Sequence, residues 1–242
     1  MTDQQSQSSF RSAILTALTA LIFGFLGAAI WSLSGLADNR TRTFLIQNPD
    51  ILPAMATALQ TQEASKRLAQ AGGAVFEPFE GAVLGNPLGS KTLVEFTDYN
   101  CPYCEASLRD VMSLVEDDPE LRVIVREYPI FQGSDVASRM ALAAALQGKY
   151  EAFHKAMFAL GPATPQSVEK AAIAVGLDME RAKADAVSDR VTAELAKNTA
   201  IARQIGFGGT PAWVTGDTAI EGAAGVERLR DAIANAGPQA ES

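Results

Sequence analysis

The sequence feature that most constrains this chain is a pair of cysteines spaced as Cys-x-x-Cys, at Cys101 and Cys104, which are its only cysteines. The run just before them is short, apolar and β-prone, which predicts a strand; its apolar residues are Leu93, Val94 and Phe96. After the pair, apolar residues recur at three- and four-residue steps, which predicts an amphipathic helix; they are Ala106, Leu108, Val111, Met112 and Val115. The cysteines are therefore predicted to lie where a strand ends and a helix begins.

This placement predicts redox chemistry. Cys101 falls at the expected N-cap and Pro102 at the first helical position, where a missing N–H costs nothing. Free backbone N–H groups and the positive end of the helix dipole would face the Cys101 sulfur and favour thiolate over thiol. A thiolate is the species that attacks a disulfide. Cys104, one turn on, is placed to close a redox-active Cys101–Cys104 disulfide, and we predict no other cofactor.

Other uses of a Cys-x-x-Cys pair fit less well. A zinc site takes about four Cys or His ligands, and the chain has one histidine, His154, so we predict no metal site. Haem attachment needs a histidine directly after the second cysteine, where this chain has Glu105. A structural disulfide would close too short a loop to stabilise much, but it stays open as an alternative. His154 follows the apolar Phe153 as a surface or packing residue, and we assign it no catalytic role.

Composition and charge point away from nucleic acids. The formal net charge is −8, and no basic patch suits a phosphate backbone. Hydrophobic residues make up 48% of the chain, enough to bury a sizeable core in one domain with additions. Both cysteines lie in one motif, which fits an oxidising compartment, although a cysteine-poor cytosolic protein has a similar composition.

The N-terminal region predicts a membrane segment. After a short tail, 1–11, residues 12–37 carry no charge, and a helix needs about 20 residues to cross a bilayer. A cleaved signal peptide is the alternative: its apolar core is usually shorter, about 7 to 15 residues, but Gly35, Leu36 and Ala37 resemble a small-x-small cleavage site. We therefore predict a single-pass inner-membrane anchor with a periplasmic domain, or a soluble periplasmic protein if the segment is cleaved.

Residues 38–74 predict a helical stalk. Asn48, Pro49 and Asp50 separate two helical stretches. The second stretch has an apolar stripe that would either join copies of the chain or pack on its own domain; the stripe comprises Ile51, Leu52, Met55, Ala58, Leu59 and Ala69.

The remainder, 75–238, predicts one folded domain, followed by a tail at 239–242. We expect an edge strand over 75–79, then the central strand and the cysteine helix, and a second buried strand over 121–125. A helical insertion at about 132–205 interrupts the domain.

Three helices are predicted within or beside this insertion. A long one with a buried face includes Leu142 and Leu160. Thr164 caps the next, with Pro165 at its first position. Asp178 caps the third, which would carry on one side Val187, Val191 and Leu195.

After the insertion the chain returns to strand over 208–215. Pro211 lies inside this run, which argues against an ordinary central strand. A cis Thr210–Pro211 bond is one resolution, because X-Pro bonds tolerate cis far better than other bonds. Residues 216–222 predict a hairpin, and a closing helix follows that carries Val226, Leu229 and Ile233.

Three features together resemble the DsbA family of thioredoxin-fold disulfide oxidoreductases: Phe-Thr-Asp-Tyr-Asn-Cys-Pro-Tyr-Cys at 96–104, the helical insertion, and Gly-Thr-Pro-Ala at 209–212. The subgroup that the chain resembles contains ScsC and related outer-membrane-antigen proteins, which also carry an N-terminal helical segment with an Asn-Pro-Asp or Asn-Pro-Glu step. The resemblance spans roughly residues 40–236. It implies a thioredoxin-like α/β fold with an inserted α-helical domain.

The resemblance also implies roles for matching residues. Cys101 resembles the nucleophile and Cys104 the resolving thiol. Pro211 resembles the cis-proline that faces the disulfide, and the backbone of Thr210 would pair with an extended substrate strand. Glu95 matches a buried acid that exchanges a proton with Cys104, its pKa raised by burial; a simple strand-edge carboxylate is the alternative.

Two departures from DsbA bear on the activity. Tyr103 stands where the strongly oxidising DsbA has a histidine, and tyrosine cannot carry a positive charge beside the thiolate. The Pro102-Tyr103 dipeptide therefore predicts a milder oxidant; glutaredoxins share it, but they lack a membrane span and a long insertion. The stalk at 38–74 loosely resembles the segment through which ScsC-like relatives trimerise and act as isomerases.

The sequence therefore predicts an extracytoplasmic thiol–disulfide oxidoreductase, an oxidase or isomerase acting on proteins or peptides with thiols or disulfides. Its expected partners are a membrane protein that reoxidises or reduces it and further copies of itself through 38–74. Two alternatives remain open. One is a membrane-tethered oligomeric scaffold or chaperone that binds peptides and whose cysteines are incidental. The other is a copper-handling protein that binds Cu(I) through the cysteines, although no Met or His cluster lies beside them.

Overall fold

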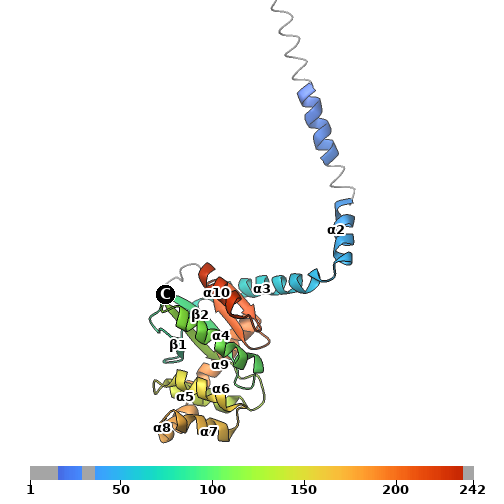
Figure 1. Cartoon of the computed structure of the whole chain (residues 1–242). Coiled ribbons are helices and arrows are strands. Elements are labelled where there is room, and N and C mark those ends of the chain that lie inside the picture. Colours follow the sequence, from blue (N-terminus) through green and yellow to red (C-terminus); the bar gives the residue numbers. More distant parts are fainter. Residues whose placement is uncertain (1–15, 29–35, 237–242) are drawn as a thin grey trace, which may run out of the picture. The chain divides into compact units, whose positions relative to one another are not determined.

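The structure, a computed structural model, describes residues 16–28 and 36–236 and divides the chain into two units at Thr57 and Ala58. In the first unit, residues 16–28 are helical. Helix α2 (Leu36–Gln47) and the start of helix α3 (Ile51–Ala71) follow, separated by the predicted break at Asn48, Pro49 and Asp50 (Figure 1).

Much of the predicted membrane segment, 12–37, lies outside the described residues, as do the predicted tails at 1–11 and 239–242. The described part at 16–28 carries exposed apolar side chains, among them Leu21, Phe23 and Phe25. None of the helices formed by residues 16–28 and 36–236 is long and apolar enough to span a bilayer.

A five-stranded mixed sheet forms the centre of the second unit, in the order β1-β3-β2-β4-β5. Strands β2 (Lys91–Thr97) and β3 (Leu121–Glu127) are parallel neighbours. Strand β4 (Ala212–Thr215) runs antiparallel to β2 and to β5 (Thr218–Glu221), which confirms the predicted hairpin. The short β1 (Val83–Gly85) pairs antiparallel with β3 at the other edge.

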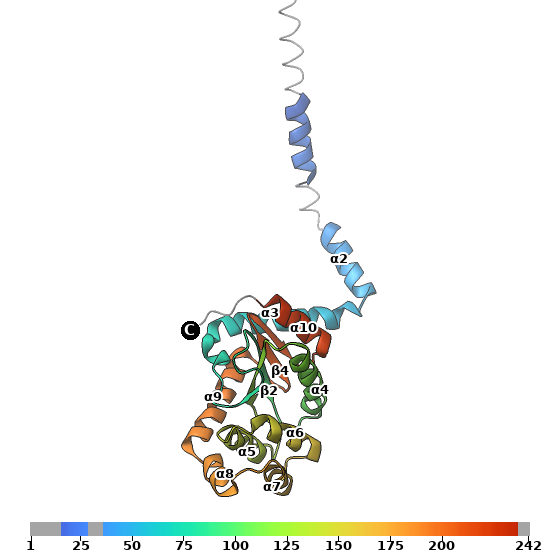
Figure 2. The same cartoon turned by 60° about the vertical axis from the view of Figure 1, so that its left-hand side comes forward.

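Helices cover both faces of the sheet (Figure 2). Helices α4 (Pro102–Asp117) and α10 (Val226–Asn235) pack on one face, and α9 (Asp189–Ile205) packs on the other. Because successive side chains of a strand point to opposite faces, Leu93 of β2 joins the core on the α4 side and Val94 joins the core on the α9 side. The predicted thioredoxin-like α/β fold is confirmed.

The predicted stalk, 38–74, is divided between the two units. Ala64 and Leu68 of α3 are buried in the core on the α9 side, so the second half of the helix belongs to the folded unit. The exposed part of its apolar stripe is Leu52, Met55 and Leu59.

The insertion contains more helices than the sequence predicted. Helices α5 and α6 replace the single long helix, because the chain turns between them at Gly148, whose φ of 66° is left-handed. Helix α8 starts at the predicted Asp178 cap but stops early, because Ser188 caps α9 and leaves Val187 exposed. The bounds are α5 (Asp135–Ala145), α6 (Tyr150–Leu160), α7 (Pro165–Ala174) and α8 (Met179–Ala186).

Helix α7 begins as predicted, with the Thr164 side chain accepting a hydrogen bond from the backbone N–H of Ser167. Helices α5 to α8 lie together at one end of the sheet, the lower end in both views (Figures 1 and 2).

The prediction of an edge strand over 75–79 is wrong. Residues 73–76 form a 3₁₀ turn, η1 (Gly73–Phe76), and the first strand begins at Val83. Val75 and Phe79 are buried as the alternation suggested, but a loop buries them. Pro78 has no N–H to donate to a strand ladder.

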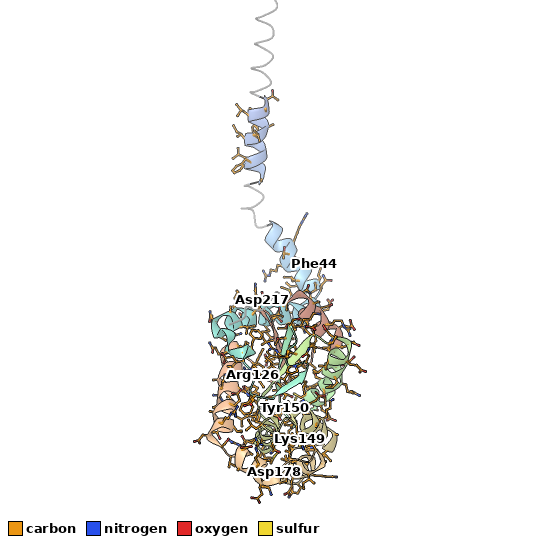
Figure 3. The ribbon with its side chains drawn as sticks, turned by 90° about the vertical axis from the view of Figure 1, so that its left-hand side faces the viewer. Phe44, Arg126, Lys149, Tyr150, Asp178 and Asp217 are labelled. Carbon is orange, nitrogen blue, oxygen red and sulfur yellow. The ribbon has the colours of Figure 1, made fainter. Side chains whose placement is uncertain are left out.

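Arg126 of β3 joins the chain that follows α3 to the sheet and to α9 (Figure 3). Its guanidinium is 1% exposed and donates hydrogen bonds in several directions. The acceptors, at 2.6 to 3.2 Å, are the carbonyl oxygens of Ala74, Val75 and Glu77, the Asn198 amide oxygen and the Glu194 carboxylate. A buried cation is tolerated here because its donors are satisfied.

We predict that Arg126→Met lowers the free energy of unfolding by about 3 kcal/mol or more, because buried acceptors lose their donor. Urea denaturation measures the change. Arg122→Met on the same strand, at a half-buried site, is the matched control and should cost less than about 1 kcal/mol. Equal losses in the two variants would show that the Arg126 contacts contribute nothing particular.

Candidate active site

The structure places the Cys-x-x-Cys pair at the predicted junction of strand and helix. Cys101 is the N-cap of α4 and Pro102 its first residue. The Cys101 N–H donates to the Asp98 carbonyl at 3.1 Å, and the Cys104 N–H donates to the Cys101 carbonyl at 3.1 Å. Both cysteines are free thiols and both are buried. The backbone therefore holds the two sulfurs on the first turn of one helix.

The loop before β4 lies directly against this turn. The Thr210–Pro211 peptide bond is cis. The Cys101 thiol donates to the Thr210 carbonyl oxygen across 3.1 Å. The fold thus brings the predicted nucleophile and the predicted substrate-binding loop into contact, although they are far apart in the sequence.

Glu95 is buried in the centre of β2, with β3 on one side and β4 on the other. It is not a strand-edge carboxylate. Burial, and after it the negative charge of Glu127, raises its pKa from 4.5 to about 8. Its Oε2 atom is buried without a hydrogen-bond partner.

The Cys104 thiol shares this environment with Glu95. Burial raises the pKa of Cys104, and the charge of Glu95 raises it further. A thiol with a raised pKa holds its proton more tightly than a solvent-exposed cysteine, so a neighbouring base is needed to remove it. Glu95 is a buried acid close enough for its charge to raise the pKa of this thiol.

The two residues between the cysteines face solvent. Pro102 is exposed, and the Tyr103 side chain is 65% exposed. The predicted dipeptide is therefore accessible to a substrate at the edge of the site.

A groove of about 600 Å³ opens beside Cys101. One wall is the turn that carries the cysteines, and the other comes from the insertion and the loops that bound it. Its walls include Tyr99, Asn100, Pro102, Phe131, Phe158 and Pro162. Phe131 is partly exposed in the free protein, so the groove offers an apolar surface next to the reactive sulfur.

Sequence reasoning missed two residues that hold this groove together. The buried Asp98 carboxylate accepts hydrogen bonds from the N–H groups of Ile130 at 2.6 Å and Phe131 at 2.9 Å, and from the Ser134 hydroxyl. Asn100 donates to the Gln132 carbonyl at 3.1 Å and accepts from the Ala163 N–H at 2.7 Å. The available signal was a run of turn-forming polar residues between an apolar strand and the cysteines.

A metal site is a separate question. Within residues 16–28 and 36–236, no group of three or more His, Cys, Asp or Glu side chains is arranged to hold a metal ion.

Comparison with known proteins shows which family this fold and site define. The chain belongs to the DsbA-like thioredoxin domain family, whose model matches residues 92–234. It is therefore a thiol–disulfide oxidoreductase of the thioredoxin fold. The match includes both cysteines and the Thr210–Pro211 loop.

Solved structures agree with this assignment. The chain is 44% identical to a thioredoxin-like oxidoreductase from Silicibacter pomeroyi, with 67% of this chain and 95% of that one covered and a TM-score of 0.64. A linker-deletion mutant of Proteus mirabilis ScsC is 28% identical, with 82% and 92% covered and a TM-score of 0.63. A periplasmic thioredoxin-like protein from Salmonella enterica serovar Typhimurium is 27% identical, with 68% and 94% covered and a TM-score of 0.60. The expected resemblance to ScsC is confirmed.

Two curated Na⁺/H⁺ antiporters named NhaA, from Salinispora arenicola and Salinispora tropica, also match. Each is 26% identical to this chain over 164 residues, which is 66% of this chain. The chain spans about a quarter of the length of these curated relatives (25%). Antiport therefore does not carry over to this chain.

We predict that the reduced protein loses stability as the pH rises from about 5 to 8. The pKa of Glu95 is higher in the folded protein than its ordinary value, so the folded state keeps a proton that the unfolded chain has lost. That stabilisation is complete below pH 4.5 and is lost as the pH rises through about 8. The slope is up to about 1.4 kcal/mol per pH unit for one such group.

Urea denaturation of the reduced protein at several pH values measures this slope. Glu127, whose pKa is also raised to about 8, contributes in the same direction. Glu95→Gln should therefore reduce the slope without abolishing it. An unchanged slope in Glu95→Gln would contradict a raised pKa at this residue.

Proposed function

We propose that this chain catalyses thiol–disulfide exchange on extracytoplasmic proteins, with Cys101 as nucleophile and Cys104 as resolving thiol. The observation that carries the proposal is the 3.1 Å contact between Cys101 Sγ, at the start of α4, and the Thr210 carbonyl before the cis-proline. It sets a sulfur at a helix N-terminus beside a backbone that an extended peptide can pair with.

Oxidation of a dithiol substrate follows from this arrangement. A substrate thiolate attacks Cys101 Sγ of the Cys101–Cys104 disulfide; the S–S bond breaks, and Cys104 leaves as a thiolate that takes a proton from Glu95. A second substrate thiolate then attacks the substrate sulfur of the mixed disulfide and displaces Cys101. The substrate loses two electrons, and the Cys101–Cys104 pair gains them. Isomerisation uses the same attack with Cys101 as the thiolate.

The groove beside Cys101 supports a protein substrate over a small thiol. Its aromatic residues, Phe131 and Phe158, suit apolar side chains that flank a substrate cysteine. The exposed Tyr103 supplies no positive charge to stabilise the Cys101 thiolate, so we infer a milder oxidant than DsbA. A membrane protein that reoxidises or reduces the pair completes the cycle.

The two cysteines should behave differently when each is replaced by serine. Cys101→Ser should abolish both insulin reduction and the oxidation of reduced ribonuclease, because the attacking sulfur is gone. Cys104→Ser keeps the nucleophile but cannot resolve, so it should accumulate mixed disulfides, visible on non-reducing gels and cleaved by dithiothreitol. A fully active Cys101→Ser variant would refute the assignment of roles.

A second function, a peptide-binding scaffold or chaperone, is favoured by one observation. Apolar side chains of the first unit and of α3 are exposed, among them Phe44, Ile46, Leu52 and Met55. Such residues suit association with further copies of the chain through 38–74. Suppression of substrate aggregation that survives the loss of both cysteines, in a parent without exchange activity, would favour this function.

We further propose that residues 12–37 anchor the chain in the inner membrane with its catalytic domain in the periplasm. The uncharged run is long enough for a spanning helix, and one structural relative is described as periplasmic. A cleaved signal peptide is the alternative.

Cell fractionation distinguishes the two. The anchored protein should sediment with membranes and resist extraction at alkaline pH, while a variant lacking 1–37 but exported by a cleavable signal should be soluble and still active. A soluble wild-type protein whose mature N-terminus follows Ala37 would show cleavage instead.

A further inference from the structure

A second buried acid, Glu127, lies close to the acid of the active site. It ends β3, is fully buried, and stands opposite Thr97 in the register that places Glu95 opposite Val125. The two glutamates are thus diagonal neighbours on adjacent strands, and both point to the α4 side of the sheet. The proposed exchange mechanism uses only one of them.

Two tyrosines hold the Glu127 carboxylate in place. Its Oε1 atom accepts hydrogen bonds from the Tyr99 hydroxyl at 3.0 Å and from the Tyr150 hydroxyl at 2.7 Å. Its Oε2 atom is buried without a partner. Tyr99 also lines the groove beside Cys101, and Tyr150 lies in the interior of the folded unit (Figure 3). The carboxylate therefore joins the turn that carries the cysteines to the insertion.

His154 completes the cluster as a neutral group. Its Nδ1 lies 2.8 Å from the Tyr99 hydroxyl. Because Tyr99 donates its proton to Glu127, Nδ1 carries the hydrogen and the buried Nε2 has none. Burial lowers the pKa of His154 to about 3. The residue that the sequence left without a role is thus a buried hydrogen-bond donor and brings no positive charge.

The groups around Glu127 come from each element packed against it. They are Glu95 from β2, Asp98 and Tyr99 from the turn before α4, Ser138 from α5, and Tyr150 and His154 from α6. From α9, Asn198 donates to the Glu127 backbone carbonyl at 3.1 Å. None of these described groups is a cation. Arg126 points to the opposite face of the sheet.

Two carboxyl groups that share a dry, uncompensated site do not readily ionise together. We propose that Glu127 and Glu95 form a coupled pair that holds one proton between them at mildly alkaline pH, with Glu127 acting as a positioning residue that sets when Glu95 can give or take the proton of Cys104. The inference rests on the proposed function for its catalytic consequence.

The proton balance of each step follows. When a substrate thiolate opens the Cys101–Cys104 disulfide, the departing Cys104 thiolate takes the shared proton through Glu95, and the pair is left with two negative charges. When Cys104 closes the disulfide again, its proton returns to Glu95 as the S–S bond forms and the substrate thiolate leaves. The repulsion between Glu95 and Glu127 thus drives the pair to recover a proton.

Carboxyl-¹³C NMR titration of the reduced full chain, labelled at glutamate Cδ, tests the coupling directly. In Glu127→Gln the midpoint of the Glu95 titration should fall by about one to two pH units, because the neighbouring charge is gone. In Glu95→Gln the Glu127 midpoint should fall by the same amount, since coupling between two sites is reciprocal. If Glu127→Gln does not fold, Glu95→Gln still tests the coupling.

Glu194→Gln is the matched control, since it removes one charge from the group that pairs with Arg126 on the other face of the sheet. It should leave both midpoints within a few tenths of a pH unit. Midpoints that stay unchanged in Glu127→Gln and Glu95→Gln, or that move as far in Glu194→Gln, would overturn the coupled pair.

The catalytic consequence has its own readout. Closure of the disulfide needs Glu95 as a base, so its single-turnover rate should rise with pH through the Glu95 midpoint, and in Glu127→Gln this rise should come at lower pH. About a tenfold faster closure below the parent midpoint corresponds to a shift of one pH unit. A parent that exchanges no disulfides refutes the proposed function; NMR shifts without a shifted rate profile refute only the role of Glu127.

Discussion

The Asp98 carboxylate accepts hydrogen bonds from the backbone of the 130–131 loop and from Ser134, while its own carbonyl accepts from the Cys101 N–H. It has no cation beside it among these contacts, so hydrogen bonds alone compensate for its burial. One side chain thereby connects the end of β2, the start of the cysteine helix and the entrance to the insertion. Asn100 repeats this arrangement two residues on, at the loop that precedes α7. The reactive turn and the opposite wall of the groove are held to one another, so the groove is formed before a substrate arrives.

Local patterns were enough to place the cysteines. A β-prone run, a proline at the first helical position and a three-to-four spacing each depend on neighbours in sequence, and β2 and α4 follow them. The prediction of an edge strand over 75–79 was wrong because a loop can bury alternate residues as a strand does. The prediction of one long helix was wrong because the chain turns at Gly148, although the apolar residues keep their helical spacing across that turn. The resemblance to a family, and not spacing, raised the expectation of a cis bond at Pro211, because cis X-Pro bonds are uncommon.

The acid cluster lay beyond sequence reasoning for a different reason. Glu127 meets Glu95 only through the β2–β3 register, and it meets Tyr150 and His154 only once the insertion has packed. No local pattern encodes such a meeting. A glutamate at the end of an apolar strand is expected to be exposed to solvent. Here Glu127 is buried, because the hydroxyl groups of Tyr99 and Tyr150 donate hydrogen bonds to it. Burial of polar groups is decided by the partners that tertiary structure supplies.

The position of Tyr103 separates the redox chemistry of the cysteine pair from the stability of the fold and the shape of the groove. Its side chain is 65% exposed, and it contributes neither to the hydrophobic core nor to the lining of the groove. Its backbone nevertheless lies in the first turn of α4, two residues after Cys101. A change at this one site can alter the electron affinity of the disulfide while the scaffold and the substrate surface stay as they are. Within the proposed thiol–disulfide exchange, Tyr103 is therefore the position at which the redox potential of the pair can be changed independently of the fold.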